Sequence, residues 1–197
     1  MGSARKSYLL LQPSLYGGGE VSIERWIRVP NGVHTASLAG ECGCNMDQES
    51  ARLAEFVLHP TLKRILALWE TKRAGRRWPS RSDFDPTEMT YALGDISLYD
   101  IHENPRRFWC RLDGSRQVEL FGVDCSRRYL DECFDADYYA VAQQSFSRTV
   151  DSGEPQYYRR EIPYAGRLIQ YEVVMLPLSS DGAKVDQLMI VLTPHWD

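Results

Sequence analysis

The chain has 197 residues, of which 43% are hydrophobic and 25% are charged, a composition typical of a globular domain of ordinary size with an extension. A formal net charge of −4 argues against general binding of nucleic acid, so any surface that binds phosphate would have to be local. No apolar run approaches the roughly 20 residues of a membrane span. Five cysteines, an odd number without an export signal, favour free thiols in a reducing compartment, so we expect a cytoplasmic protein.

The first 45 residues differ from the rest of the chain. They contain a run of three glycines at 17–19 and show no sustained helical or alternating apolar pattern. We therefore expect a disordered or loosely attached leader over 1–45. A strongly patterned region opens at Met46, and we hypothesise that the native product begins there.

N-terminal helices and a connector are predicted over 46–94. Helical spacing of apolar residues starts at 47, and a second helix is expected from Pro60 to a stop near Gly75. The segment Asp85-Pro86-Thr87-Glu88 has the residues of a capped helix start, because its first carboxylate can cap the early amides and its last can reach back. Each amphipathic helix needs its apolar face covered, so the helices over 47–73 are candidates for a homodimer or partner interface.

From residue 95 onward the pattern predicts an α+β domain, 95–197. Alternating apolar residues, turn residues and caps predict, in chain order, strands around 96–101 and 108–112, short helical turns within 115–134, a longer helix from Asp135 or Asp137 to Gly153, and strands over 157–164, 168–177 and 185–193. We expect these strands to form a five-stranded antiparallel sheet with helices on one face. A small ligand would then fit between the sheet and its helical cover.

Several segments resemble the PAS domain, a bacterial sensory module. Residues 121–131 (FGVDCSRRYLD) resemble the segment of that domain in which a glycine turn precedes a short helix, and 176–182 (LPLSSDG) resemble its final hairpin. Residues 68–73 (LWETKR), 79–86 (PSRSDFDP) and 111–115 (RLDGS) together resemble a family of short, single-domain bacterial PAS-like proteins. The resemblance covers about residues 58–193 and implies a PAS-like sheet and a non-enzymatic signalling role, through a small ligand or a protein partner.

Within that fold, aromatic and polar side chains are the candidates for a ligand pocket, although most buried aromatic residues simply fill the core. The candidates are Trp109, Arg111, Tyr129, Tyr138, Phe146 and Tyr171. Arg111 or Tyr129 would anchor the polar part of a ligand. Arg111 could equally project into solvent or pair with Asp113 or Glu172.

The connector between the helices is rich in arginine, which offers a second candidate site. Arg73, Arg76, Arg77 and Arg81 could bind a phosphate group or nucleic acid. However, residues 63–81 hold seven basic and one acidic side chain, whereas 82–105 hold six acidic side chains and no lysine or arginine. Because the two segments can neutralise one another, a self-paired, solvated connector is the favoured interpretation, and nucleic-acid binding is the alternative.

No motif for a metal, a cofactor or a reaction is present. The histidines, at 34, 59, 102 and 195, lack the spacing of a metal site. The sequence lacks the cysteine motif of flavin-adduct photoreceptors and a clear haem ligand on the long helix. It also lacks the glycine-serine elbow of hydrolases. We therefore expect no catalytic residues, no metal and no enzymatic activity.

Overall fold

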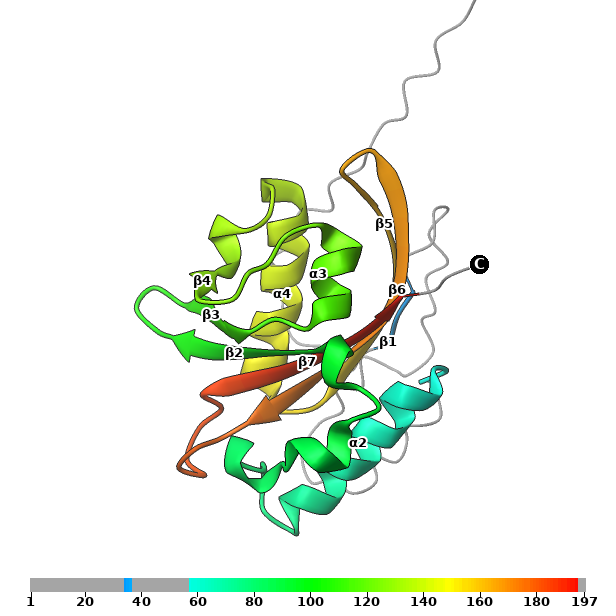
Figure 1. The fold of residues 1–197 in the computed structure, drawn as a ribbon. Coiled ribbons are helices and arrows are strands. Elements are labelled where there is room, and N and C mark those ends of the chain that lie inside the picture. Colours follow the sequence, from blue (N-terminus) through cyan, green and yellow to red (C-terminus); the bar gives the residue numbers. More distant parts are fainter. Residues whose placement is uncertain (1–33, 37–56, 195–197) are drawn as a thin grey trace, which may run out of the picture.

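The computed structural model describes residues 34–36 and 57–194 (Figure 1). Most of the expected leader and almost all of the helix expected from residue 47 lie outside these residues. In the part of the chain that the structure describes, no helix combines the length and the apolar character that a membrane crossing requires.

Helix α2 (Pro60–Arg73) begins and ends as its sequence predicts. His59 is the N-cap, and its Nδ1 atom accepts a hydrogen bond from the Thr61 amide at 3.2 Å. Pro60 occupies the first helical position, where its missing amide hydrogen costs nothing. Beyond Arg73 the backbone turns left-handed, and Gly75 has a φ of +79°. The helix therefore ends where the glycine was expected to stop it.

The connector contains only short 3₁₀ turns: η1 (Arg81–Asp83), η2 (Pro86–Met89) and η3 (Leu93–Asp95). The capping box at Asp85 is present, with the Asp85 carboxylate accepting from the Thr87 amide at 2.9 Å and Glu88 accepting from the Asp85 amide at 3.3 Å. The start signal is confirmed, but the helix that it begins is a single 3₁₀ turn of four residues.

The strands form one antiparallel sheet with the order β1-β5-β6-β7-β2-β3-β4. Its members are β1 (His34–Ala36), β2 (Ile96–His102), β3 (Arg107–Leu112), β4 (Arg128–Tyr129), β5 (Gln156–Tyr164), β6 (Arg167–Leu178) and β7 (Gln187–Pro194). All five predicted strands are present. The predicted strand number is nevertheless wrong, because residues 57–194 contain six strands: the two residues of β4 pair with β3, too short a segment for an alternating pattern to reveal. Beyond β5, β1 extends the sheet further.

Helices α3 (Ser115–Phe121) and α4 (Ala136–Ser152), with the turn η4 (Leu130–Glu132), lie between β3 and β5 in the chain. Asp135 caps α4 by accepting from the Tyr138 amide at 2.8 Å, and Gly153 ends the helix with a φ of +69°. Both boundaries of this long helix agree with the sequence prediction.

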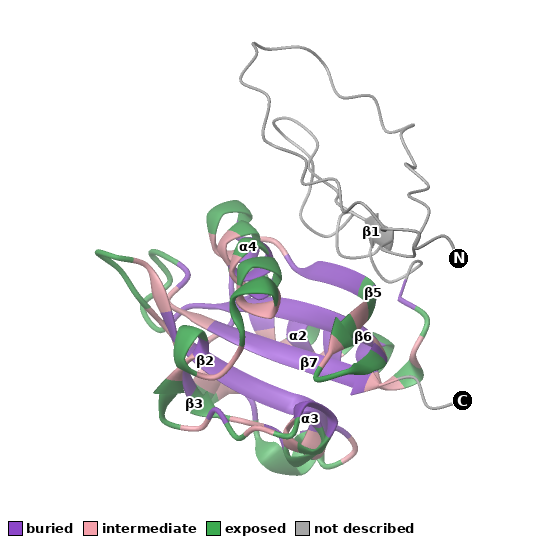
Figure 2. Ribbon diagram, turned by 90° about the horizontal axis from the view of Figure 1, so that it is seen from above, coloured by how far each residue is buried: buried purple, intermediate pink, exposed green. Residues whose placement is uncertain are grey.

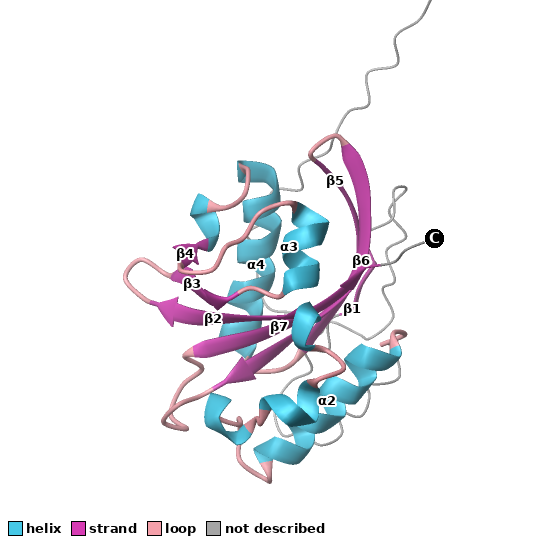
Figure 3. Ribbon diagram, in the orientation of Figure 1, coloured by secondary structure: helices cyan, strands magenta, loops and turns pink. Residues whose placement is uncertain are grey.

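Helices cover both faces of the sheet, not one as expected. Figures 1 and 3 show α3 and α4 on one face and α2 with the connector on the other. The indole Nε1 of Trp69 in α2 donates to the Pro177 carbonyl of β6 at 2.9 Å. The fully buried Glu172 carboxylate accepts from the amides of Leu58 and His59 at 3.2 and 3.0 Å, which ties the start of α2 to the same strand. The apolar face of α2 is thus covered by the sheet of the same chain. A dimer interface is therefore not needed to bury this face, which was the reason for expecting one.

Buried residues concentrate along the central strands, whereas the outer turns of the helices are exposed (Figure 2). Successive side chains on a strand point to opposite faces. On β6, Tyr171, Val173 and Met175 therefore face α3 and α4, while Glu172 and its alternating neighbours face α2. The candidate site is on the face of α3 and α4.

Candidate functional site

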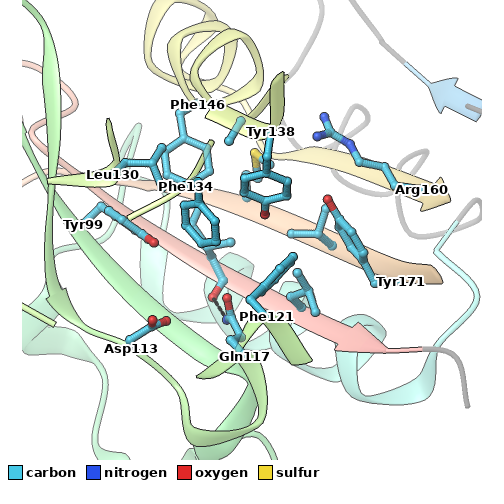
Figure 4. Close-up of a pocket in the computed structure, with 15 residues that line it drawn as sticks. Tyr99, Asp113, Gln117, Phe121, Leu130, Phe134, Tyr138, Phe146, Arg160 and Tyr171 are labelled. Carbon is cyan, nitrogen blue, oxygen red and sulfur yellow. Dashed lines mark hydrogen bonds between the residues drawn. The ribbon is translucent and has the colours of Figure 1, made fainter. Parts of the chain in front are cut away.

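A cavity lies between the sheet and the helices α3 and α4 (Figure 4). Its volume is about 30 Å³, room for roughly one or two water molecules or for a group as small as a carboxylate. The residues that line it come from six strands and helices and from the segments between them: Tyr99, Asp113, Gln117, Phe121, Leu130, Phe134, Tyr138, Ala142, Phe146, Arg160, Tyr171, Val173, Met175, Ile190 and Leu192.

Aromatic rings form much of the cavity wall. Phe121 at the end of α3 lies 5.5 Å from Phe134, 5.1 Å from Tyr138 and 6.0 Å from Tyr171 between ring centroids, mostly in edge-on arrangements. Further along α4, the Phe146 ring meets Tyr99 of β2 edge-on at 5.0 Å. Edge-on pairs at these distances are the favoured geometry for aromatic side chains, so the wall is well packed.

The most unusual group in the wall is Arg160 of β5. Only 6% of this residue is exposed. Its Nη2 atom donates to the Ser145 hydroxyl of α4, and its guanidinium lies 4.6 Å from the centre of the Tyr158 ring. Its Nε atom is buried and has no hydrogen-bond partner among the described residues. Arginine stays protonated even when buried, so this wall of the cavity carries a positive charge.

Asp113 and Gln117 supply polar groups elsewhere in the wall. The Asp113 carboxylate accepts from the Ser97 hydroxyl at 2.6 Å and from the Cys125 amide at 3.0 Å. Burial raises the pKa of Asp113, although these hydrogen bonds oppose the shift. The Gln117 amide group donates to the Asp95 carbonyl at 2.6 Å, which holds its side chain against the sheet. Both residues are therefore already bonded within the fold.

The tyrosines of the cavity are neutral at ordinary pH. Burial raises the pKa of Tyr99 and of Tyr138 well above the usual value, and it raises that of Tyr171 despite the opposing charge of Arg160. Their hydroxyl groups can therefore donate as well as accept hydrogen bonds. Figure 4 shows the hydroxyls of Tyr138 and Tyr171 turned toward one another, on the side of the cavity where Arg160 lies.

A family model described as PAS domain matches residues 57–193, which is most of the chain and runs from α2 to the last but one residue of β7. The chain belongs to the PAS domain family. The resemblance inferred from the sequence is thus confirmed, and PAS domains are in general sensory and signalling modules. A comparison with curated proteins found no match.

Three of the six predicted pocket residues line the cavity of this PAS domain: Tyr138, Phe146 and Tyr171. Trp109, Arg111 and Tyr129 do not. Phe108 and Cys110 are the residues of β3 that point toward α4, so the alternating neighbours lie on the opposite side of the strand.

The other three predicted pocket residues have partners outside the cavity. Arg111 is exposed and pairs with the Asp100 carboxylate at 2.7 Å, which is neither of the two carboxylates considered for it. The Tyr129 ring packs edge-on against Trp109 at 4.8 Å, and its hydroxyl is 2.8 Å from Nδ1 of His102. These three residues thus lie outside the cavity, with Arg111 exposed and Trp109 and Tyr129 only partly buried.

Two of the four connector arginines of the PAS domain pair with carboxylates of their own segment. Arg73 binds Glu70, and Arg76 contacts Asp83 at 2.7 Å. Lys72 contacts Glu88 at 2.7 Å. The remaining two arginines also have contacts within the segment, since Arg77 lies over the Trp78 ring and Arg81 donates to the Phe84 carbonyl. Of these pairs, Lys72–Glu88 and Arg76–Asp83 join the basic segment 63–81 to the acidic segment 82–105, as the predicted self-paired connector requires.

Arg160 and the polar groups at Asp113 and Gln117 were missed by sequence reasoning. Arg160 lies between Tyr158 and Ile162 in the alternation of β5, so it shares their face. This alternation was the one signal in the sequence that could have indicated an inward-facing Arg160. Neither a metal cluster of histidine, cysteine and acidic side chains nor a disulfide is found among the described residues, and Cys110, Cys125 and Cys133 are free thiols.

Proposed function

We propose that this PAS domain is a non-enzymatic sensory module that binds a small molecule in the cavity between the sheet and helices α3 and α4. The observation that supports the proposal is the cavity itself, an aromatic space in the core with a few convergent polar groups. Ligand sites in proteins commonly have this composition.

A ligand in this position would contact both the sheet and the helices that cover it. It would touch β6 through Tyr171 and α4 through Tyr138 and Ala142. Binding that favours one position of α4 relative to the sheet would shift the population of that state, which is how a sensory domain passes on a signal. We propose that a protein partner reads this change. A cytoplasmic location also stays our proposal, supported by the free thiols.

Native mass spectrometry of the full chain, purified without denaturation, tests the proposal. We expect a small molecule that stays bound under native conditions and is released on unfolding. The variant Ala142→Leu, which fills the cavity from α4, should lose this molecule. Ala140→Leu places the same side chain at an exposed position of the same helix, so it should retain it.

If no molecule co-purifies, the wild type and the two variants can be compared in a thermal-shift screen of small metabolites. A ligand that binds only the folded state raises the melting temperature. We expect compounds that stabilise the wild type and Ala140→Leu but not Ala142→Leu. A screen in which no compound distinguishes the two variants would contradict the proposed cavity site.

A further inference from the structure

We propose that the ligand of this cavity carries a carboxylate and that Arg160 binds it. The inference rests on the proposed function and adds the chemical class of the ligand. It also assigns a binding role to a residue outside the six candidates that the sequence suggested.

The first step is the position of the charge. Arg160 faces inward from β5, and only 6% of the residue is exposed to solvent. Its Nη2 atom donates to the Ser145 hydroxyl, whose own proton is donated to the Val141 carbonyl at 2.9 Å, and the Arg160 side chain also donates to the neutral Tyr171 hydroxyl. The Ser145 hydroxyl therefore acts as a neutral acceptor. The buried Nε–H group has no partner among the described residues.

The second step is the missing countercharge. Buried charges in proteins are normally paired with an opposite charge, because taking an unpaired ion out of water is costly. Arg160 forms no ion pair with any carboxylate of the described residues, although Arg73, Arg76, Arg106, Arg107, Arg111 and Arg116 all do. Its neighbours Tyr158 and Tyr171 are buried and Tyr138 is partly buried. Burial raises the pKa of all three phenols, so they remain neutral.

The third step is the shape of the missing anion. A guanidinium presents its N–H groups in a planar fork, which matches the two oxygens of a carboxylate. The cavity volume of about 30 Å³ suits a group of this size better than a larger tetrahedral anion. The hydroxyls of Tyr138 and Tyr171 lie on the same side of the cavity (Figure 4) and are hydrogen-bonded to one another. Because Tyr138 donates to Tyr171, the Tyr171 proton is left to bind one oxygen of the carboxylate.

The experiment compares charged and neutral molecules of the same shape. Thermal shifts of the full chain are measured in chloride-free buffer with sodium formate and acetate, and with formamide and acetamide. We expect saturable stabilisation by at least one of the two carboxylates and none by either amide. This comparison uses only the wild type, so it does not depend on the folding of any variant.

Two matched variants assign the effect to Arg160. Arg160→Gln removes the charge inside the cavity, whereas Arg159→Gln makes the same change at the exposed neighbouring position of β5. Removing one partner of a buried, hydrogen-bonded charge pair weakens binding by at least about 30-fold. We expect this loss in Arg160→Gln and an unchanged affinity in Arg159→Gln. Should Arg160→Gln fail to fold, Arg160→Lys, which keeps the charge but loses the fork, should weaken carboxylate binding in the same direction.

Equal stabilisation by carboxylates and amides, or by acetate in the wild type and in Arg160→Gln, would overturn the carboxylate assignment and leave water as the partner of Arg160. The proposed cavity site would survive that result if a neutral compound still distinguished Ala140→Leu from Ala142→Leu. If no compound did so, the proposed function itself would fail.

Discussion

Gly114 lies where the end of β3 meets the chain before β2, and replacing it with alanine should be strongly destabilising. Its φ of −69° is ordinary for any residue, so backbone strain is not the cause. A Cβ atom at this position would lie 2.4 Å from the Gly94 carbonyl oxygen and 2.8 Å from that of Ile96. Reaching even 3.0 Å from the first oxygen requires a shift of about 0.6 Å in atoms that belong to the backbone.

Overpacking in a dense interior costs about 1–3 kcal/mol. Because the clashing atoms are main-chain carbonyls beside a paired strand, we expect Gly114→Ala to cost about 3 kcal/mol. Gly122→Ala is the matched control: Gly122 has a φ of +71° but open space around its Cβ position, so only backbone strain of about 1 kcal/mol applies. Urea unfolding followed by tryptophan fluorescence measures both free energies. If Gly114→Ala is no more destabilising than Gly122→Ala, the close approach does not exist in solution.

Further outcomes are expected at three other places in the chain. Trp69→Phe leaves the Pro177 carbonyl without its indole donor and should lower the free energy of unfolding by about 1–2 kcal/mol; an unchanged urea midpoint would argue against the packing of α2 on β6. Burial raises the pKa of the Cys110 thiol from 9.0 to about 12, so at pH 8 only about one thiol in ten thousand is ionised and iodoacetamide should label it only after unfolding. Because the unfolded thiol ionises first, Cys110 should also make stability fall as the pH rises from 9 to 12; rapid native labelling would contradict its burial. A double-mutant cycle on Arg76 and Asp83, which are 2.7 Å apart and partly exposed, should give a coupling energy of about 0–1 kcal/mol, and a larger value would mean that the connector is more rigid than its exposure indicates.

Local signals predicted the boundaries of this fold well because they depend only on neighbouring residues. Asp135 and Gly153 bound α4 through a side-chain cap and a left-handed turn, and both effects act within one helical turn. The turn between β5 and β6 was also predicted from a local signal, the glycine at 166. Ala165 and Gly166 both adopt positive φ, which is the backbone conformation of a tight hairpin.

Features that depend on distant partners were not predictable in this way. The apolar stripe of α2 shows that this face of the helix must be covered. It does not show that the cover is the face of the sheet opposite α3 and α4. The alternation in β3 separates Phe108 and Cys110 from Trp109 and Arg111, but the inward face is known only once α4 is in place. Arg160 presents the same difficulty, because a charged residue on a strand normally faces solvent.

Backbone NMR during an acetate titration of the full chain would locate the ligand site directly. We expect saturable chemical-shift changes in the amides of Tyr138, Arg160 and Tyr171, which line the cavity, and of Ser145, which is bonded to Arg160. The changes should be much smaller when acetamide replaces acetate. Saturable changes confined to the connector around Arg76, or an absence of saturable changes with both molecules, would contradict a carboxylate-binding cavity between the sheet and α4.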